Sequence, residues 1–582
     1  MEHSGSLAKQ TRNESQPPIS RRDALKAALT TASAATTAAL LAACGGGGAP
    51  PNPPTEVPKA TTGSGVGTAV PTVATGSGTT QPTSAAGSSV AQSSVASAAG
   101  TPKRGGILVV GNTTDAPSLE PHKDAATGRA LRTQLMYSYL VQADKDLKIQ
   151  PDLAEKWEVA PDAKTYTFFL RKGVKFHNGR ELVATDVKYS LERILEPTSY
   201  GRGFISSIDT IETPDPYTVK LNLKGPDAAM LASVASSYAA IVAKEDVDKG
   251  GGRLDKSDGG SGPFMLDLWD QGQAVKLKRN PNYYIKDLPY LDGITYQVIP
   301  EETSVISQLR SGNVDLYSLQ DLKNYDQLKD VSNLTAVRIP GEGMQYMNMD
   351  HTKEPFGKLE VRQAISWAVD RREVLQAAIA GVGSLTAPIP PALKDFALDA
   401  STVPQFKPDL AKAKDLLAKA GLANGFKSEL QVIVGAPVNI NEGQVVADQL
   451  KKIGIDLTIK QVEYGVWIKG FNDHTFTTTM NGTAGNPDPD TLLTGRLGSK
   501  GANNNNWSDA DVDDLLAQGR ASLDLAKRKE IYNKLQMVLI DKAPQIWLFA
   551  PDITEVMKKA VKGYVPNPSS FLPGLVSAWL ER

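Results

Sequence analysis

Cysteine is almost absent from this sequence, which has a single one, Cys44, in 582 residues. No disulfide can therefore form within the chain, and no cluster of thiolates can hold a metal ion. The histidines after Cys44 are far apart and form no His-x-x-x-His pair: His122, His177, His351 and His474. The sequence accordingly predicts no metal site and no cofactor.

Net charge is also small, at −1 for the whole chain. Residues 1–43 hold five basic and three acidic side chains, so the part from Cys44 onward is near −3. A chain without a basic excess cannot neutralise many phosphates, and this argues against a nucleic-acid partner. After residues 24–43, no apolar run approaches the roughly 20 residues of a membrane helix.

The surroundings of Cys44 are typical of a lipid attachment site. Residues 41–44 read Leu-Ala-Ala-Cys, the pattern of a bacterial lipobox, and they end an apolar run of small residues from Ala24 to Ala43. Arg21 and Arg22 precede this run nearly in the twin-arginine arrangement, with Ala24 where an aromatic residue is usual. We predict a signal peptide over 1–43 and a lipidated Cys44 that holds the chain at an extracytoplasmic membrane face.

Residues 44–103 contain mainly Gly, Ser, Thr, Ala, Pro and Val, with almost no charge and few aromatic residues. Such a segment cannot bury enough surface to fold. As a flexible linker it would reach roughly 40–45 Å. The sequence therefore predicts a folded body attached to a membrane by a long tether.

The body from residue 104 to 582 is too long for a single core and predicts two or three domains. Strand and helix patterns alternate along it, which indicates an α/β or mixed fold. We expect strands at 106–111, 165–170 and 455–459. Helices are expected at 183–195, capped by Thr185 or Asp186, and at 361–369, 409–420 and 445–452.

Motifs of common enzymes do not occur: there is no Gly-x-Ser-x-Gly elbow, no Walker loop and no His-Glu-x-x-His. Ser261 has the nearest serine context, but a turn is the better interpretation. Residues 509–520 resemble a calcium loop that lacks the required Gly and Glu, so we expect Ser508 or Asp509 to cap a helix instead. Asp488 and Asp490 could be paired acid and base, although their Pro-rich context favours a turn. We expect no enzyme.

Four blocks of the sequence closely resemble family 5 of the extracellular solute-binding proteins, which includes the oligopeptide- and dipeptide-binding components of ABC importers. They occur in the family's order and span the body: Trp157–Arg193 (WEVAPDAKTYTFFLRKGVKFHNGRELVATDVKYSLER), Gly262–Tyr284 (GPFMLDLWDQGQAVKLKRNPNYY), Tyr346–Arg371 (YMNMDHTKEPFGKLEVRQAISWAVDR) and Gly563–Tyr564. Most of these residues are structural. They indicate the fold and leave the ligand open.

The resemblance implies a two-lobed, periplasmic-binding-protein-like α/β fold of type II, with an extra subdomain in the first lobe. The large lobe would comprise 104–316 and 546–582, and the small lobe 317–545. A solute would bind between the lobes, which close over it by a hinge motion. The closed monomer would deliver the solute to the permease subunits of an ABC importer.

The resemblance also implies where a peptide would bind. In the family's peptide binders, backbone groups of both lobes pair with the ligand like added strands. The matching stretches here contain Asp124, Ala125 and Thr127 in the large lobe and Asn481, Gly482, Thr483 and Gly485 in the small lobe. Aromatic residues that could line the cleft, or else belong to a core or its rim, are Trp269, Tyr317, Tyr346 and Trp467.

Two departures from the pattern of the family's peptide binders leave the identity of the ligand open. Free-peptide binders of this family hold the ligand's amino terminus with an aspartate where this chain has Gly485, and dipeptide binders hold its carboxylate with an arginine that is missing from residues 437–443. Asp488, Asp124 or another group would have to substitute, because an unpaired buried charge is expensive. Alternatively the solute is an oligosaccharide, an opine or a metal complex. A secreted hydrolase is the alternative from another class.

Overall fold

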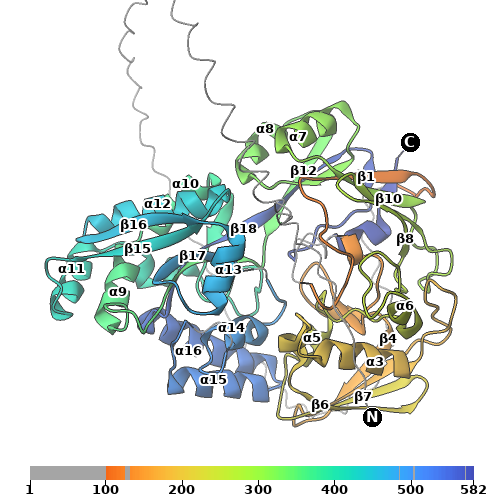
Figure 1. The fold of residues 1–582 in the computed structure, drawn as a ribbon, viewed down its shortest axis with the longest axis horizontal. Coiled ribbons are helices and arrows are strands. Elements are labelled where there is room, and N and C mark those ends of the chain that lie inside the picture. Colours follow the sequence, from red (N-terminus) through yellow and green to blue (C-terminus); the bar gives the residue numbers. More distant parts are fainter. Residues whose placement is uncertain (1–99, 125–131, 484, 502–504, 570–571, 582) are drawn as a thin grey trace, which may run out of the picture. The chain divides into compact units, whose positions relative to one another are not determined.

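The computed structural model describes residues 100–124, 132–483, 485–501, 505–569 and 572–581. The predicted signal peptide, Cys44 and all but the last four residues of the predicted linker lie outside the described residues. So do Ala125 and Thr127. Figure 1 shows the described chain as a mixture of helices and strands, in agreement with the α/β prediction.

The largest sheet has twelve strands that fall into two groups. The first group consists of β1 (Ile107–Asn112), β8 (Phe264–Asp270), β9 (Ala274–Arg279), β10 (Gly293–Val298), β11 (Leu316–Ser318) and β12 (Leu334–Pro340). The second consists of β13 (Met344–Met349), β14 (Gly383–Leu385), β15 (Phe426–Ile433), β16 (Ile455–Val462) and β17 (Thr478–Thr483). The twelfth strand, β18 (Gln545–Lys558), joins the two groups.

Strand β18 is shared along its length. Its first part, from Gln545 to Pro551, pairs antiparallel with β13 and β14. Its second part, from Asp552 to Lys558, pairs with β12 and β11. A single strand of 14 residues therefore completes both groups of strands.

A separate antiparallel sheet has the order β4 (Ala154–Val159), β5 (Thr165–Leu170), β7 (Thr218–Leu223) and β6 (Ile208–Asp215). Alternate residues of β5 are buried, among them Tyr166 and Phe168, because side chains on a strand point to opposite faces. They pack with residues of α3 (Ala184–Leu195) into a core of their own. Two short antiparallel pairs complete the strands: β2 (Val141–Ala143) with β3 (Ile149–Pro151), and β19 (Val561–Lys562) with β20 (Trp579–Leu580).

The remaining helices connect and cover these sheets. In chain order they are α4 (Arg202–Ile205), α5 (Met230–Val234), α6 (Lys244–Lys249), α7 (Glu302–Ser311), α8 (Tyr325–Leu328), α9 (Leu359–Ala368), α10 (Arg371–Ile379), α11 (Leu410–Lys419), α12 (Pro437–Lys451), α13 (Tyr464–Asn472), α14 (Pro489–Leu497), α15 (Ala510–Ala521) and α16 (Leu525–Lys542). Helix α12 packs on β15, β16 and β17, and α14 packs on α15, which packs on α16 (Figure 1).

Most elements predicted from the sequence are confirmed. The predicted strands appear as β1, β5 and β16, and the predicted helices as α3, α9, α11 and α12. Asp409 and Asp509 cap α11 and α15 with their carboxylates, as capping residues should.

Two local predictions were wrong. Val183 is the N-cap residue of α3, and the Asp186 carboxylate accepts a hydrogen bond of 2.9 Å from the Val183 backbone N–H. Helix α12 begins at Pro437, eight residues before the predicted start. Its first half has no apolar stripe to reveal it, but a proline in the first turn suits a helix start.

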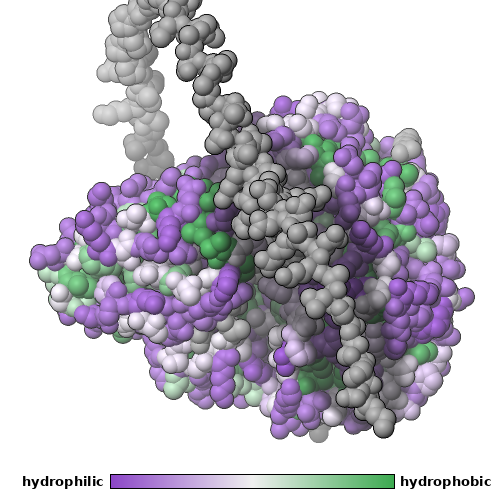
Figure 2. Space-filling model, viewed as in Figure 1, coloured by the Kyte–Doolittle hydropathy of each residue, from purple (hydrophilic) through white to green (hydrophobic). Residues whose placement is uncertain are grey.

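Hydrophilic residues cover most of the face visible in Figure 2, with small hydrophobic patches between them. Within the described ranges, no helix is long and apolar enough to span a membrane.

Candidate solute-binding site

The predicted small-lobe contacts lie at the end of an inner strand. Strand β17 runs between β13 and β15, and its last three residues, Asn481, Gly482 and Thr483, lie opposite residues 344–346 of β13. Asn481 is 6% exposed. The Thr483 hydroxyl accepts a hydrogen bond from the Arg496 guanidinium of α14. The strand end is thus held from both the sheet and the following helix.

Glu342 lies where a side chain of residue 485 would have to be. Met344, the first residue of β13, pairs with Thr483, the last residue of β17; Glu342 precedes this pair by two residues and Gly485 follows it by two. A Cβ on Gly485 would lie 2.1 Å from Glu342 Cβ and 2.4 Å from Glu342 Cγ. Real Cβ atoms do not approach other carbons so closely, and the Glu342 backbone carbon would also lie only 2.7 Å away, so residue 485 cannot carry a side chain unless the backbone shifts.

The Glu342 carboxyl is almost inaccessible. The residue is 2% exposed, and burial raises the pKa of its carboxyl to about 7. Its Oε2 has no hydrogen-bond partner within the part of the chain that the structure describes. Its backbone N–H donates to the carbonyl of Pro568, 3.2 Å away. Glu342 was not singled out from the sequence, although an acid between two glycines in a strand connection is an available signal.

Two of the four candidate aromatic residues lie beside β17. Tyr346 on β13 is 2% exposed, and the Arg496 guanidinium lies 5.9 Å from its ring centroid. Trp467 on α13 donates from Nε1 to the Thr479 hydroxyl of β17 over 2.7 Å, and its ring stacks on Phe471.

The other two candidate aromatic residues lie away from β17. Tyr317 on β11 is 1% exposed and packs in the core beside α7, where burial raises the pKa of its hydroxyl. Trp269 on β8 places Nε1 3.3 Å from the carboxylate oxygens of Asp115. The structure does not bring these two side chains together with those of β17.

Asp488 and Asp490 each bind an arginine. Asp488 is the N-cap residue of α14 and accepts two hydrogen bonds of 2.8 Å from Arg528 of α16. Asp490 lies 3.2 Å from Arg520 of α15, although burial raises the pKa of its carboxyl. These pairs tie the beginning of α14 to α15 and α16, so the carboxylates hold the helices that follow β17.

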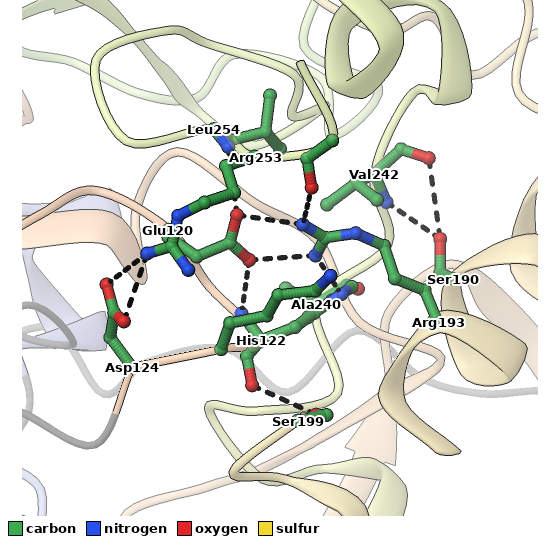
Figure 3. Close-up of polar contacts among 12 residues, drawn as sticks. Glu120, His122, Asp124, Ser190, Arg193, Ser199, Ala240, Val242, Arg253 and Leu254 are labelled. Atoms are coloured by element: carbon green, nitrogen blue, oxygen red, sulfur yellow. Dashed lines mark hydrogen bonds and ion pairs between the residues drawn. The ribbon is translucent and has the colours of Figure 1, made fainter. Parts of the chain in front are cut away.

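Asp124 is likewise paired, as Figure 3 shows. The Arg253 guanidinium donates to both of its carboxylate oxygens, at 3.0 and 2.9 Å. The adjoining Glu120 binds Arg193 through two hydrogen bonds of 2.7 and 2.8 Å. Burial alone would raise the pKa of Glu120, but the pairing with Arg193 and two backbone N–H donors lower it to about 2. This network fixes the segment that leads into residues 125–131.

Ser261, whose sequence context most resembles that of a hydrolase nucleophile, is fully buried. A Cβ on its neighbours Gly260 or Gly262 would lie 2.0 Å from the Met136 carbonyl oxygen or 2.6 Å from that of Leu135. The segment is a close backbone crossing with a bend at Gly262 and Pro263, and no turn is assigned at Ser261 itself. No group of three His, Cys, Asp or Glu suited to a metal occurs among the described residues.

A second buried acid near β18 was also missed. Glu555, opposite Ser318 of β11, is 1% exposed and accepts a hydrogen bond of 2.7 Å from the Tyr564 hydroxyl. Burial raises the pKa of its carboxyl to about 7. Glu555 follows Thr554 in the second half of β18, and its burial depends on distant segments that sequence patterns do not reveal.

Comparison with known proteins identifies the class. Residues 148–504, more than half of the chain, match the family model for bacterial extracellular solute-binding proteins, family 5 (middle). The dipeptide-binding protein of Escherichia coli K12 is 31% identical over 455 residues, which cover 72% of this chain and 84% of that protein.

Solved structures of binding proteins are also similar to this chain. The periplasmic binding protein DppA of Helicobacter pylori, in complex with the peptide STSA, matches with a TM-score of 0.73 and 27% identity, over 82% of this chain and 99% of the other. AgaA from A.tumefacien R10, in complex with agropinic acid, matches with a TM-score of 0.73 and 31% identity over the same shares.

The fold and these matches define a two-lobed solute-binding receptor. This chain belongs to family 5 of the bacterial extracellular solute-binding proteins. The predicted family and fold class are therefore confirmed, and so is the role of capturing a solute outside the cytoplasm.

Proposed function

We propose that this chain is the membrane-anchored receptor of an ABC importer and that its solute is a peptide. The observation that carries the peptide assignment is the similarity, over most of both chains, to a dipeptide-binding protein and to a binding protein solved with the peptide STSA. The lipid on Cys44 and the linker 44–103 would keep the receptor beside its permease. No bond of the solute is made or broken in this proposal.

In the proposed mechanism, a large lobe of 104–316 and 546–582 and a small lobe of 317–545 close over the solute. Contacts between these segments already exist: the Ala228 N–H donates to the Arg520 carbonyl over 2.9 Å, and Lys394 lies 3.7 Å from Asp146. A solute that touches both lobes only when they are closed adds its binding free energy to such contacts.

Within the small lobe, we propose that the peptide lies along the end of β17. Backbone groups near Asn481, Gly482 and Thr483 would pair with the ligand backbone, which gives affinity with little demand on ligand side chains. The carboxylates of Asp124 and Asp488 would stabilise the segments around the site without contacting the ligand, since each already binds an arginine. Tyr346 and Trp467 would support β17 from either side.

A non-peptide solute is the second candidate. It is favoured by the similarity to AgaA, whose structure contains agropinic acid, and by the absence of an arginine from residues 437–443. In the structure this segment is the first turns of α12.

One experiment separates the candidates. The full-length receptor is purified without added solute and gently denatured, and the released molecules are identified by mass spectrometry. We expect a mixture of short peptides. A single opine-like or sugar compound would replace the peptide assignment with the second candidate. Cleavage of the released compounds after prolonged incubation with fresh receptor would indicate a hydrolase.

A further inference from the structure

Among the buried acids of the residues that the structure describes, Glu342 differs in that its carboxyl group accepts no hydrogen bond and its Oε2 is fully enclosed. Each other buried acid of the described residues accepts at least one hydrogen bond from a side chain or a backbone N–H: Glu120, Asp152, Asp186, Asp227, Asp315, Asp350, Glu442, Asp488, Asp490, Asp552 and Glu555. Buried carboxyl groups are normally satisfied in this way, because an unpaired one loses its hydration without compensation.

Close contacts with other backbone segments fix the backbone around Glu342. A Cβ on Gly341 would lie 2.5 Å from the carbonyl oxygen of Pro551, and one on Gly343 would lie 2.7 Å from that of Thr483. The Glu342 N–H is bound to the carbonyl of Pro568. A carboxyl group on so fixed a backbone is a preorganised acceptor, and a binding partner would not have to order it first.

Basic groups on the neighbouring elements are engaged elsewhere. Arg338 on β12 binds Asp552 of β18. Arg496 on α14 donates to the Thr483 hydroxyl, and its guanidinium lies over the ring of Tyr346. Neither of these two arginines is therefore free to neutralise Glu342, and within the described residues its carboxyl group is left open to a cation of the solute.

The position of Glu342 also suits contact with a solute. It lies against Gly485, two residues beyond the end of β17, the strand proposed to bind the ligand. Its backbone contact to Pro568 joins a residue of the proposed small lobe to one of the proposed large lobe. A group bound here would therefore be enclosed at the boundary of the two lobes.

From these observations we infer that Glu342 binds a cationic nitrogen of the solute, either an ammonium or a guanidinium group. This inference rests on the proposed receptor function and narrows its solute to compounds that carry such a group. Charge-assisted hydrogen bonds to a carboxylate are roughly twice as strong as neutral ones. A solute without the cation would leave the buried carboxyl unpaired, so Glu342 selects against it.

The test uses the full-length receptor, freed of bound solute, and three probes. The first is an equimolar library of alanine di- to pentapeptides with free amino termini. The second is the same library acetylated at the amino terminus. The third is a set of non-peptide cations: putrescine, agmatine and arginine. Binding is measured by titration calorimetry for the wild type, for Glu342→Gln, which keeps the shape and removes the charge, and for the exposed control Glu530→Gln. Urea unfolding verifies that each variant is folded.

We expect the wild type and Glu530→Gln to bind free peptides and to reject the acetylated library, and Glu342→Gln to lose at least tenfold in affinity. Equal binding of free and acetylated peptides by the wild type would overturn the inference, as would unchanged affinity in Glu342→Gln.

The remaining outcomes separate the inference from the proposed function. Binding of the non-peptide cations alone, weakened in Glu342→Gln, would overturn the peptide assignment and support the role of Glu342. Binding of acetylated peptides alone would overturn that role and leave a peptide receptor. Binding of no probe would count against both.

Discussion

Glu342 and Gly485 face each other on neighbouring chain segments, and the Cβ that residue 485 lacks would lie 2.1 Å from the Cβ of Glu342. The glycine at position 485 is therefore required by the side chain and backbone at position 342. A substitution at either position should alter the packing at the other.

Gly485→Ala should destabilise the protein by about 1–3 kcal/mol, the usual effect of an extra carbon forced into packed surroundings. Urea unfolding measures this. The double variant Gly485→Ala with Glu342→Ala should recover little of the loss, because alanine at 342 keeps the Cβ that would lie 2.1 Å away and the backbone carbon that would lie 2.7 Å away. Gly495→Ala, where nothing lies within 4 Å of the added carbon, is the matched control and should not destabilise. An unchanged stability in Gly485→Ala would mean that the two segments are not in contact.

Glu342→Gln should stabilise the solute-free protein at high pH. Because the folded pKa is raised to about 7 from 4.5, the folded state keeps a proton that the unfolded state releases between these values. The wild-type contribution is therefore most favourable below pH 4.5 and falls as the pH rises through 7. The variant should gain as much as about 3 kcal/mol at pH 8 and little at pH 4.5. Equal differences at both pH values, from urea unfolding, would contradict a buried carboxyl.

Glu120→Gln should lower the free energy of unfolding by about 3–5 kcal/mol, because it leaves the buried Arg193 without its counter-ion. The folded pKa of Glu120 is depressed to about 2, so its contribution is present above 4.5 and is lost as the pH falls toward 2. The difference between wild type and variant should therefore shrink in acid. Glu196→Gln, at the exposed partner of Lys123, should cost at most about 1 kcal/mol.

Asp488→Asn should reduce stability and leave solute affinity unchanged. The substitution removes the counter-ion of the buried Arg528, which should cost about 3–5 kcal/mol. Thermal unfolding gives the first quantity, and calorimetry with the peptides released from the native receptor gives the second. A tenfold loss of affinity in a fully folded sample would assign Asp488 to the ligand. Asp511→Asn, whose carboxylate is exposed, is the control.

Cys44→Ser should release the protein from the membrane fraction, since the thiol that would carry the lipid is gone. Fractionation of cells followed by immunodetection measures the distribution. The variant should bind the same peptides as the wild type, because the predicted linker separates Cys44 from the folded body. Retention in the membrane after the substitution would refute the predicted lipid anchor.

Regular elements of this protein could be predicted from the sequence where periodicity is strong. The alternation in β5 and the apolar stripe of α3 are local patterns, and both led to the right element. The start of α12 was not predicted because its first turns alternate apolar and polar residues without a helical apolar stripe, and only a proline marks its beginning.

The residues of the candidate site were harder to predict from local sequence patterns than the helices and strands. Asn481, Gly482 and Thr483 could be selected from a family resemblance, but the partners that occupy Asp124 and Asp488 lie 129 and 40 residues away in the chain. Glu342 was not predicted as a site residue because its neighbour in the fold, Gly485, is distant in the sequence, and no local pattern shows that the two residues are in contact. A carboxylate's role depends on which cation the fold brings to it, and short-range patterns do not contain that information.

The position of β18 near the end of the chain has a consequence for biosynthesis. Strands β11, β12 and β13 all receive a neighbour from residues 545–558, so none of them reaches its full hydrogen bonding until the ribosome has made almost the entire protein. We therefore expect nascent chains that stop before residue 545 to remain sensitive to protease, and native resistance to arise only after the carboxyl-terminal strand has emerged.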